Sequence, residues 1–468
     1  MRKIVLAAAI LLIVAGGWVA YSVRQNARVQ KAAAADRLRI ILITLDTTRS
    51  DHLSCYGYKR ETSPYIDRLA ERGVKFTNCY TSMPTTDPAH VSILTSAYPV
   101  THGVLKNGME LTNPNVVSIA EFLKKKGFFT AAIVARRALS PEILKVKGFD
   151  YASGPKRREK RADKIYGEAV KLIDEHVADD LFLWVHFFDP HYPYDPPNPY
   201  ATRFGTGIRS KIKKPVGFHP ESVQWKEEEI EHFVSLYDGE ISYMDSYIGK
   251  LLDYLDQRFS KSPTQPFIIL VGDHGETLGE LRSRYNFVFG HGAFLHDHIT
   301  KVPLIMSWKG RLPEGKTVDS LIESVDIAPT IVDVALDGKP EQFAGVSFEG
   351  PLLGEAEQPK SFLFVQRRLF DQLPANFEGA PPEFLKYREL AIISSDYKLI
   401  DNKYKGIELY RVGEDLEGND LAETEAEVVQ KLQAALSQWW ETYYVPTASQ
   451  QEISEEKKEI LRSLGYIP

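Results

Sequence analysis

The order of apolar and polar positions along the chain predicts a parallel sheet covered by helices. Continuous apolar runs rich in β-branched or aromatic residues are typical of strands buried on both faces, and they occur at residues 40–45, 128–134, 180–188 and 266–271. Segments with helical periodicity alternate with these runs, at residues 63–73, 116–126 and 230–255. This alternation indicates an α/β fold with a large, mostly parallel sheet between helices.

The apolar pattern changes near residue 353. Beyond it, short apolar segments at residues 391–393 and 397–400 predict antiparallel strands, and residues 424–443 have helical periodicity. We therefore expect a large domain at residues 39–353, followed by a smaller C-terminal α+β subdomain at residues 354–468.

The N-terminal residues have a pattern of their own. Arg2 and Lys3 precede an uncharged apolar run at residues 4–23, and Arg24 follows it. A helix of about twenty residues is about 30 Å long, which matches the core of a bilayer. We expect residues 1–27 to form a single-pass membrane anchor or a signal segment, residues 28–38 to be a linker, and the rest of the chain to be periplasmic or extracellular. Cleavage near the alanines at residues 32–35 would give a secreted protein.

Composition limits the classes of partner. The chain of 468 residues has 57 basic and 63 acidic residues and a formal net charge of −6, so it lacks the basic surface that nucleic-acid binding requires, and we expect no nucleic-acid partner. Its two cysteines, Cys55 and Cys79, exclude a disulfide framework. A single bridge between them remains open at this stage.

Three of the predicted strands are each followed by an aspartate: Asp46, Asp189 and Asp273. A carboxylate at the end of a buried strand is unfavourable unless it is paired or binds a metal ion. One such residue alone would be interpreted as a helix cap or a turn former. Three of them at strand ends, where α/β proteins bind their ligands, instead indicate a functional site.

Histidines near these aspartates indicate which metal ion the site would hold. His274 follows Asp273 directly, and His191 lies two residues after Asp189. His291 lies between two glycines. Carboxylates with imidazoles suit zinc, manganese or iron, whereas an all-oxygen site would suit calcium, so we expect one or two ions of zinc or manganese. Three further histidines nearby are interpreted as structural: His186, His296 and His298.

Several segments, in order along the chain, match one known family. They lie at residues 45–53, 80–96, 188–194, 271–276, 291–292, 301–305, 325–330 and 408–410. Over residues 39–468 the chain resembles the sulfatase family of the alkaline-phosphatase-like superfamily. Each segment alone is a weak match, but their number and order make a chance match improbable.

The resemblance implies a nucleophile at Thr86. Within residues 80–96, Thr86 aligns with the cysteine or serine that sulfatases oxidise to formylglycine, and Pro88 aligns with the proline of that motif. The extra methyl group of threonine would make the oxidation product a ketone rather than an aldehyde. We therefore expect Thr86 to act unmodified.

The resemblance also implies two groups of site residues. The first is a metal site formed by Asp46, Thr86, Asp273 and His274. The second group binds another metal ion or the substrate anion, and consists of Asp189, His191 and His291.

The chain also departs from the usual sulfatase pattern. Thr47 stands where a second acid is usual, His90 where the motif has arginine, and Arg136 lies in the region of a Gly-Lys-Trp-His segment. Thr-x-Pro-x-His is instead similar to the nucleotide pyrophosphatase/phosphodiesterase branch, which uses a threonine nucleophile and two zinc ions. These departures favour phosphate over sulfate esters.

We therefore expect a metal-dependent hydrolase of phosphate or sulfate esters, acting on a small molecule, a glycan or a lipid. Thr86 would form a covalent ester, with His90 as a donor to the ester oxygens. His191 and His291 would hold a second metal ion or protonate the leaving group. One alternative is a membrane-anchored phospho-alcohol transferase, although such enzymes usually have several membrane spans. Another is an inactive anion- or glycan-binding protein, although the ligand set is intact.

Overall fold

The structure is a computed structural model. It describes residues 36–445, except 157, 206, 208–216, 219–224, 339, 356–357, 371–387, 403–405 and 415–417. The expected anchor at residues 1–27 and most of the expected linker lie outside these residues. No helix in the described part is long and apolar enough to cross a membrane.

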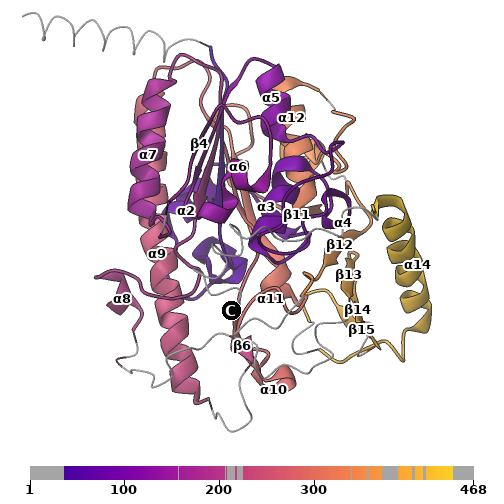
Figure 1. Cartoon of the computed structure of the whole chain (residues 1–468). Coiled ribbons are helices and arrows are strands. Elements are labelled where there is room, and N and C mark those ends of the chain that lie inside the picture. Colours follow the sequence, from indigo (N-terminus) through magenta and orange to yellow (C-terminus); the bar gives the residue numbers. More distant parts are fainter. Residues whose placement is uncertain are drawn as a thin grey trace, which may run out of the picture.

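An eight-stranded sheet forms the centre of the molecule (Figure 1). Its strands, in spatial order, are β11 (Lys316–Glu323), β2 (Val74–Tyr80), β10 (Lys301–Ser307), β7 (Phe267–Gly272), β1 (Arg39–Leu45), β5 (Leu181–Phe187), β3 (Phe129–Val134) and β4 (Tyr151–Ser153). Every neighbouring pair is parallel except the two pairs made by β10. The expected large, mostly parallel sheet is confirmed.

Side chains of the central strands alternate between two hydrophobic clusters, because successive residues of a strand point to opposite faces. From β1, Ile40 and Leu42 contribute to one cluster, whereas Ile41 and Ile43 contribute to the other. The first cluster is covered by α3 (Thr86–Thr95), α5 (Ile119–Lys125) and α12 (Ile327–Leu336). The second is covered by α2 (Pro64–Glu71), α7 (Ala162–Glu175) and α9 (Glu227–Arg258), which lie on the other side of the sheet in Figure 1.

A second, smaller sheet follows in the C-terminal part of the chain. Its four antiparallel strands are β12 (Leu363–Gln366), β13 (Glu389–Ile393), β14 (Tyr397–Asn402) and β15 (Gly406–Arg411). Helix α14 (Ala426–Tyr443) packs on this sheet through Leu432, Leu436 and Trp439. The predicted antiparallel strands and C-terminal helix are therefore present.

The shorter elements lie on the loops around the two sheets. Helical segments are η1 (Ser50–His52), η2 (Ser54–Tyr56), α4 (Pro99–His102), η3 (Arg137–Leu139), α6 (Pro141–Leu144), α8 (Tyr200–Arg203), α10 (Arg282–Tyr285), α11 (Asp297–Thr300), η4 (Ser324–Asp326) and α13 (Glu349–Leu353). A three-stranded sheet contains β6 (Gly217–Phe218), β9 (Phe287–Gly290) and β8 (Thr277–Leu278).

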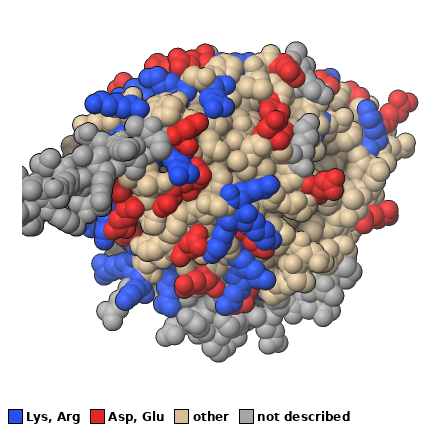
Figure 2. All heavy atoms as spheres, turned by 90° about the horizontal axis from the view of Figure 1, so that it is seen from above, with Lys and Arg blue, Asp and Glu red and all other residues tan. Residues whose placement is uncertain are grey.

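The structure also shows the state of the two cysteines and the distribution of charge on one face. Cys55 and Cys79 are both free thiols, so the possible bridge is not formed. On the face seen in Figure 2, acidic side chains lie between and around the basic ones.

The register of the central strands brings their carboxyl ends to one edge of the sheet. Leu45 pairs with Phe187 of β5 on one side and with Gly272 of β7 on the other. The residues that follow, Asp46 and Asp273, therefore leave neighbouring strands at the same level.

Candidate active site

Two aspartates and a histidine converge at the carboxyl ends of β1 and β7. The Asp273 N–H donates to Leu45 O (3.2 Å), and the Thr47 N–H donates to Asp273 Oδ1 (2.9 Å). Asp46, Asp273 and His274 are fully buried, and each offers a ligand atom within 4.8 Å of the others. Convergence of these three residues is the geometry that the sequence predicted.

The Asp46 carboxylate is held by two short-range partners. The Thr47 hydroxyl donates to Oδ1 (2.6 Å), and Oδ2 lies 3.3 Å from His186 Nε2. Because the Ala135 N–H donates to His186 Nδ1, the Nε2 of His186 carries the proton and donates to Asp46. Burial raises the pKa of Asp46, but the bond from His186 and the nearby imidazoles reverse this, so the net pKa is lowered. The sequence had classed His186 as structural, yet it orients this carboxylate.

Asp273 and His274 present the remaining ligand atoms. Asp273 Oδ2 is buried, has no hydrogen-bond partner among the described residues, and lies 3.3 Å from His274 Nε2. Burial, followed by the charge of Asp46, raises the pKa of Asp273. The His274 Nδ1–H donates to Gly275 O (2.9 Å), which leaves the lone pair on Nε2. Burial also lowers the pKa of His274, so its imidazole is neutral and able to bind a metal ion.

This donor set fits a divalent cation. A buried carboxylate oxygen without a partner is costly unless a cation compensates it. Two carboxylates and a neutral imidazole within coordinating reach of one another are ligands that zinc and manganese accept.

Thr86 lies beside these ligands at the start of α3. It is the first residue of the helix, it is fully buried, and its Oγ1 lies 3.3 Å from His274 Nε2. The N-terminus of a helix carries partial positive charge and unpaired N–H groups, which stabilise anions. The predicted nucleophile therefore lies at an electropositive helix end, beside three residues that could hold a metal ion.

His90 lies one turn further along α3, with both ring nitrogens engaged. Its Nδ1 donates to Thr86 O (2.8 Å), and its Nε2 lies 3.1 Å from Thr44 Oγ1. The Trp184 Nε1–H donates to the same Thr44 oxygen (2.9 Å), so the Thr44 hydroxyl proton is directed to His90. Burial, followed by the charge of His186, lowers the pKa of His90 to about 3. His90 therefore contacts the backbone of Thr86 and the Thr44 side chain of β1.

His191 and His291, two of the three residues expected in a second cluster, lie near Asp46, Asp273 and His274. The His291 and His274 ring centroids are 4.2 Å apart, and those of His191 and His291 are 5.4 Å apart. Burial lowers the pKa of His191 to about 4 and that of His291 to about 3, so both rings are neutral at pH 7. Glu276, which the sequence did not single out, lies 3.4 Å from His291 Nδ1 through its Oε1.

Asp189 points elsewhere. Its Oδ1 accepts from the Ala162 N–H at the start of α7 (3.2 Å) and lies 3.5 Å from Arg161 Nε. Burial raises the pKa of Asp189 to about 7. Across the described residues, Asp189, His191 and His291 do not form a second three-ligand group.

Two further buried residues, Asn107 and Arg136, were not among the site residues predicted from the sequence. The Asp87 N–H donates to Asn107 Oδ1 (2.9 Å), which orients the amide of Asn107, and its buried Nδ2 has no hydrogen-bond partner among the described residues. Arg136 is fully buried, and its charge lowers the pKa values of His186, His191 and His291. Their sequence context, a Lys-Asn-Gly loop and an Arg-Arg pair, gives no chemical signal by itself.

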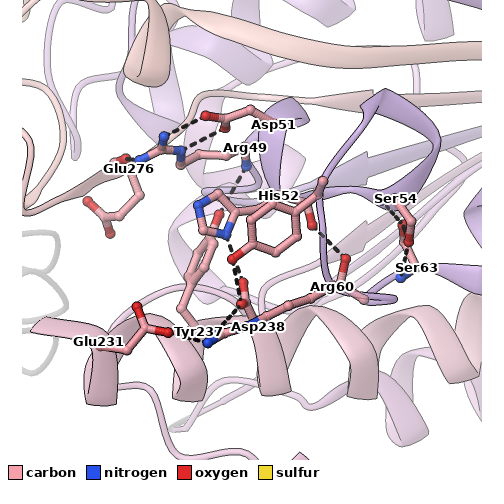
Figure 3. A network of polar contacts seen from close by, with 12 residues as sticks. Arg49, Asp51, His52, Ser54, Arg60, Ser63, Glu231, Tyr237, Asp238 and Glu276 are labelled. Atoms are coloured by element: carbon pink, nitrogen blue, oxygen red, sulfur yellow. Dashed lines mark hydrogen bonds and ion pairs between the residues drawn. The ribbon is translucent and has the colours of Figure 1, made fainter. Parts of the chain in front are cut away.

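The loop after Asp46 is fixed from below by helix α9 (Figure 3). The Tyr237 hydroxyl donates to Thr47 O (2.8 Å) and accepts from the Arg49 N–H (3.0 Å). Thr47 has a φ of 54°, which is unfavourable for a β-branched residue and must be maintained by its surroundings. Since Thr47 also binds both carboxylates, Tyr237 positions Asp46 and Asp273 through this one residue.

Tyr237→Phe is expected to lower kcat about tenfold to a hundredfold. It leaves two buried backbone groups without partners, which costs about 1–3 kcal/mol each and allows the Thr47 loop to shift relative to Thr86. Steady-state kinetics and thermal unfolding of the variant would measure both effects. Tyr254→Phe on the same helix removes only an exposed bond to Asp174 and serves as the matched control. Equal activity of the two variants would contradict this role for Tyr237.

A mostly parallel sheet that carries two aspartates and a histidine beside a hydroxyl on a helix is an arrangement suited to ester hydrolysis. The family model Sulfatase matches residues 39–337, which is more than half of the chain, and the model described as N-sulphoglucosamine sulphohydrolase, C-terminal, matches residues 288–441. The chain therefore belongs to the sulfatase family.

Curated relatives and solved structures agree with this assignment. The chain is 22% identical over 425 residues to "Uncharacterized sulfatase YidJ" of Escherichia coli, covering 80% of each chain. It is 23% identical over 372 residues to Delta 4,5-hexuronate-2-O-sulfatase of Bacteroides thetaiotaomicron, covering 71% of this chain and 75% of that one.

Among solved structures, one in complex with its substrate D-glucosamine-2-N,6-O-disulfate has a TM-score of 0.73 and 18% identity, covering 89% of this chain and 100% of that one. The phosphonate monoester hydrolase of Agrobacterium radiobacter has a TM-score of 0.70 and 19% identity, covering 90% and 99%. At these identities the likeness establishes the fold.

Proposed function

We propose that this protein hydrolyses phosphate or sulfate esters through a covalent ester on Thr86, with phosphate esters as the preferred class. The observation that supports this most is the placement of Thr86 Oγ1, 3.3 Å from His274 Nε2, at the end of α3 that faces the Asp46 and Asp273 carboxylates. Threonine cannot give the aldehyde of formylglycine, so the unmodified hydroxyl is the nucleophile in this proposal.

Asp46, Asp273 and His274 are the residues that would hold a divalent metal ion, with zinc or manganese as the proposed ion. Such an ion, when bound, would lower the pKa of the adjacent Thr86 hydroxyl, whose proton then leaves to water, and would neutralise charge on the ester oxygens. A second ion near His191 and His291 stays a prediction, since Asp189 is directed to the start of α7.

Thr86 Oγ1 forms a bond to phosphorus or sulfur as the bond to the leaving alcohol oxygen breaks. The Nδ2 of Asn107 is a buried donor beside the start of α3 that would bind a non-bridging oxygen, and the positive end of the α3 dipole would also stabilise negative charge there. The buried charge of Arg136 acts in the same direction, since it stabilises negative charge near the histidines. In this arrangement His90 positions Thr86, and its part in binding the ester is indirect.

His191 and His291 are the candidates for proton transfer. The Nδ1 of His191 donates to Tyr192 O (2.6 Å), so its Nε2 is an acceptor in the neutral ring. Because that nitrogen carries no proton, it can take one from the water that attacks the Thr86 ester in the second step, which releases the free anion, whereas the leaving alcohol of the first step takes its proton from solvent. Glu276 Oε1 lies 3.4 Å from the Nδ1 of His291.

The relatives support the substrate class only in outline. They include a hexuronate-2-O-sulfatase, a structure bound to a disulfated glucosamine, and phosphonate monoester hydrolases. A sulfate or phosphate ester of a glycan or small molecule is therefore the proposed substrate. Attachment to a membrane through residues 1–27, with the catalytic domain outside the cytoplasm, remains a proposal, as does the transferase alternative.

A panel of 4-nitrophenyl esters tests the proposal. The panel contains the phosphate monoester, the phosphate diester, the phenylphosphonate monoester and the sulfate. Each ester is added to the purified protein together with zinc, manganese or calcium. We expect kcat/KM to be highest for a phosphorus ester, with zinc or manganese. Faster cleavage of the sulfate would reverse the preference, and transfer to an added alcohol in place of hydrolysis would favour the transferase. No turnover of any ester would reject the enzyme proposal.

A further inference from the structure

A short loop next to Thr86 carries a lysine into the site region. The Asp87 N–H donates to Asn107 Oδ1 (2.9 Å), and the Gly108 N–H donates to Asp87 Oδ2 (2.7 Å). Asp87 directly follows Thr86, so these two bonds tie the loop to the start of α3. Lys106, which precedes Asn107, is thereby held close to the nucleophile and is only partly buried.

A segment of the C-terminal subdomain carries an arginine to the same place. The Gln366 N–H donates to Ser82 O (2.9 Å), and the Leu369 N–H donates to Leu105 O (3.0 Å). These bonds tie the segment to the large domain on both sides of Arg368. The guanidinium carbon of Arg368 lies over the ring of Phe370, 4.2 Å from its centroid.

Arg368 reaches the site across Gly292, the residue after His291. A Cβ at Gly292 would lie 3.0 Å from Arg368 Cδ and also 3.0 Å from Thr85 Oγ1. Thr85 is the residue before Thr86, it is fully buried, and its hydroxyl has no hydrogen-bond partner among the described residues. A glycine here leaves room for the arginine side chain between His291 and the start of α3.

Lys106 and Arg368 lie on neighbouring segments, because the residues next to them in sequence, Leu105 and Leu369, are joined by the 3.0 Å backbone hydrogen bond. Burial, and then the charge of Arg368, lowers the pKa of Lys106 to about 8. Arg368 also contributes, after burial, to the lowered pKa of His291. Backbone bonds of two separate segments therefore hold two cations together at one side of the nucleophile, an arrangement that a bound anion would stabilise.

We propose that Lys106 and Arg368 form an anion-binding subsite beside Thr86 that takes a second oxyanionic group of the substrate. The inference rests on the proposed function and makes its substrate class more specific: an ester that also carries a carboxylate, a sulfate or another phosphate. A guanidinium stacked through its face still binds an oxyanion through its N–H edge, and the lysine adds a point charge. The buried Thr85 hydroxyl supplies a neutral donor beside them.

Binding of phosphonates to the full-length protein with zinc tests this subsite by calorimetry. Methylphosphonate carries one anionic group, whereas phosphonoacetate, 3-phosphonopropionate, 3-phosphonopropanesulfonate and propylene bisphosphonate carry two. We expect the best two-anion ligand to bind about tenfold to a hundredfold more tightly than methylphosphonate. Arg368→Gln and Lys106→Gln should each reduce that preference to less than about threefold. Comparison of the four two-anion ligands shows whether the subsite prefers a carboxylate, a sulfonate or a phosphonate as the second anionic group.

Control variants separate this effect from metal chelation and from packing. Lys309→Gln and Arg311→Gln change exposed cations elsewhere and should keep the preference. Arg368→Lys and Lys106→Arg keep the charge and should recover part of it. If Arg368→Gln does not fold, Lys106→Gln, on another segment, decides the question.

The proposal is overturned if the unmodified protein shows no preference for two-anion ligands, or if both glutamine variants keep it. Hydrolysis of a simple aryl ester by the unmodified protein is measured alongside. Hydrolysis without the preference rejects the subsite alone, whereas the preference without hydrolysis rejects the proposed function alone.

Discussion

Thr86→Ala is expected to lower kcat for the preferred ester by at least about a thousandfold, because it removes the atom that forms the covalent ester. The side chain lies at the first position of α3, and its hydroxyl contacts His274 Nε2 at 3.3 Å among the described residues, so its loss should leave the fold intact. Steady-state kinetics would measure the loss, and thermal unfolding would verify the fold.

Two variants make this result specific to the Thr86 hydroxyl. Thr95→Ala removes a hydroxyl from the same helix, one that donates to Val91 O (2.6 Å), and should leave kcat within about twofold. Thr86→Ser keeps a hydroxyl and should retain measurable turnover. Mass spectrometry of the Thr86 peptide after rapid quenching should show a phosphoryl or sulfuryl adduct in the unmodified protein. Substantial turnover by Thr86→Ala would refute a covalent ester at this position.

The strands that the sequence predicted are those buried on both faces. β1, β5 and β7 consist of continuous apolar runs, and they are found within a residue or two of the expected bounds. β2 was missed because Lys75, Thr77 and Asn78 interrupt its apolar residues near one edge of the sheet. β10 was also not predicted as a strand, and its antiparallel direction depends on the connections between strands, which leave no local signal.

The sequence predicted the positions of those site residues that directly follow the ends of strands. Asp46 and Asp273 meet because they follow adjacent parallel strands in register, and His274 follows Asp273 directly. Asp189 lies one residue further beyond its strand, and a turn in which the His191 N–H donates to Phe188 O takes it towards α7. Sequence does not reveal that turn, and it does not show that His186, inside an apolar run, faces Asp46.

Addition of zinc or manganese to the metal-free protein is expected to raise its unfolding temperature and to restore turnover by at least about a hundredfold. The reason is that Asp46 and Asp273 are adjacent buried acids whose repulsion a bound cation removes. An ion at a hundred times its dissociation constant raises the free energy of unfolding by about 2.7 kcal/mol. Because burial and Asp46 raise the pKa of Asp273, ion binding displaces a proton, and the increase should be larger at pH 8 than at pH 6.

Asp273→Asn should abolish both the temperature shift and its pH dependence, since the amide neither carries the charge nor releases a proton. Asp253→Asn, which changes an exposed partner of Arg68 on α9, should keep both and controls for the loss of one negative charge. Scanning calorimetry with and without the ion, at the two pH values, measures each variant. A shift that persists in Asp273→Asn would place the ion elsewhere, and it would then remove the basis for activating Thr86 from the carboxyl ends of β1 and β7.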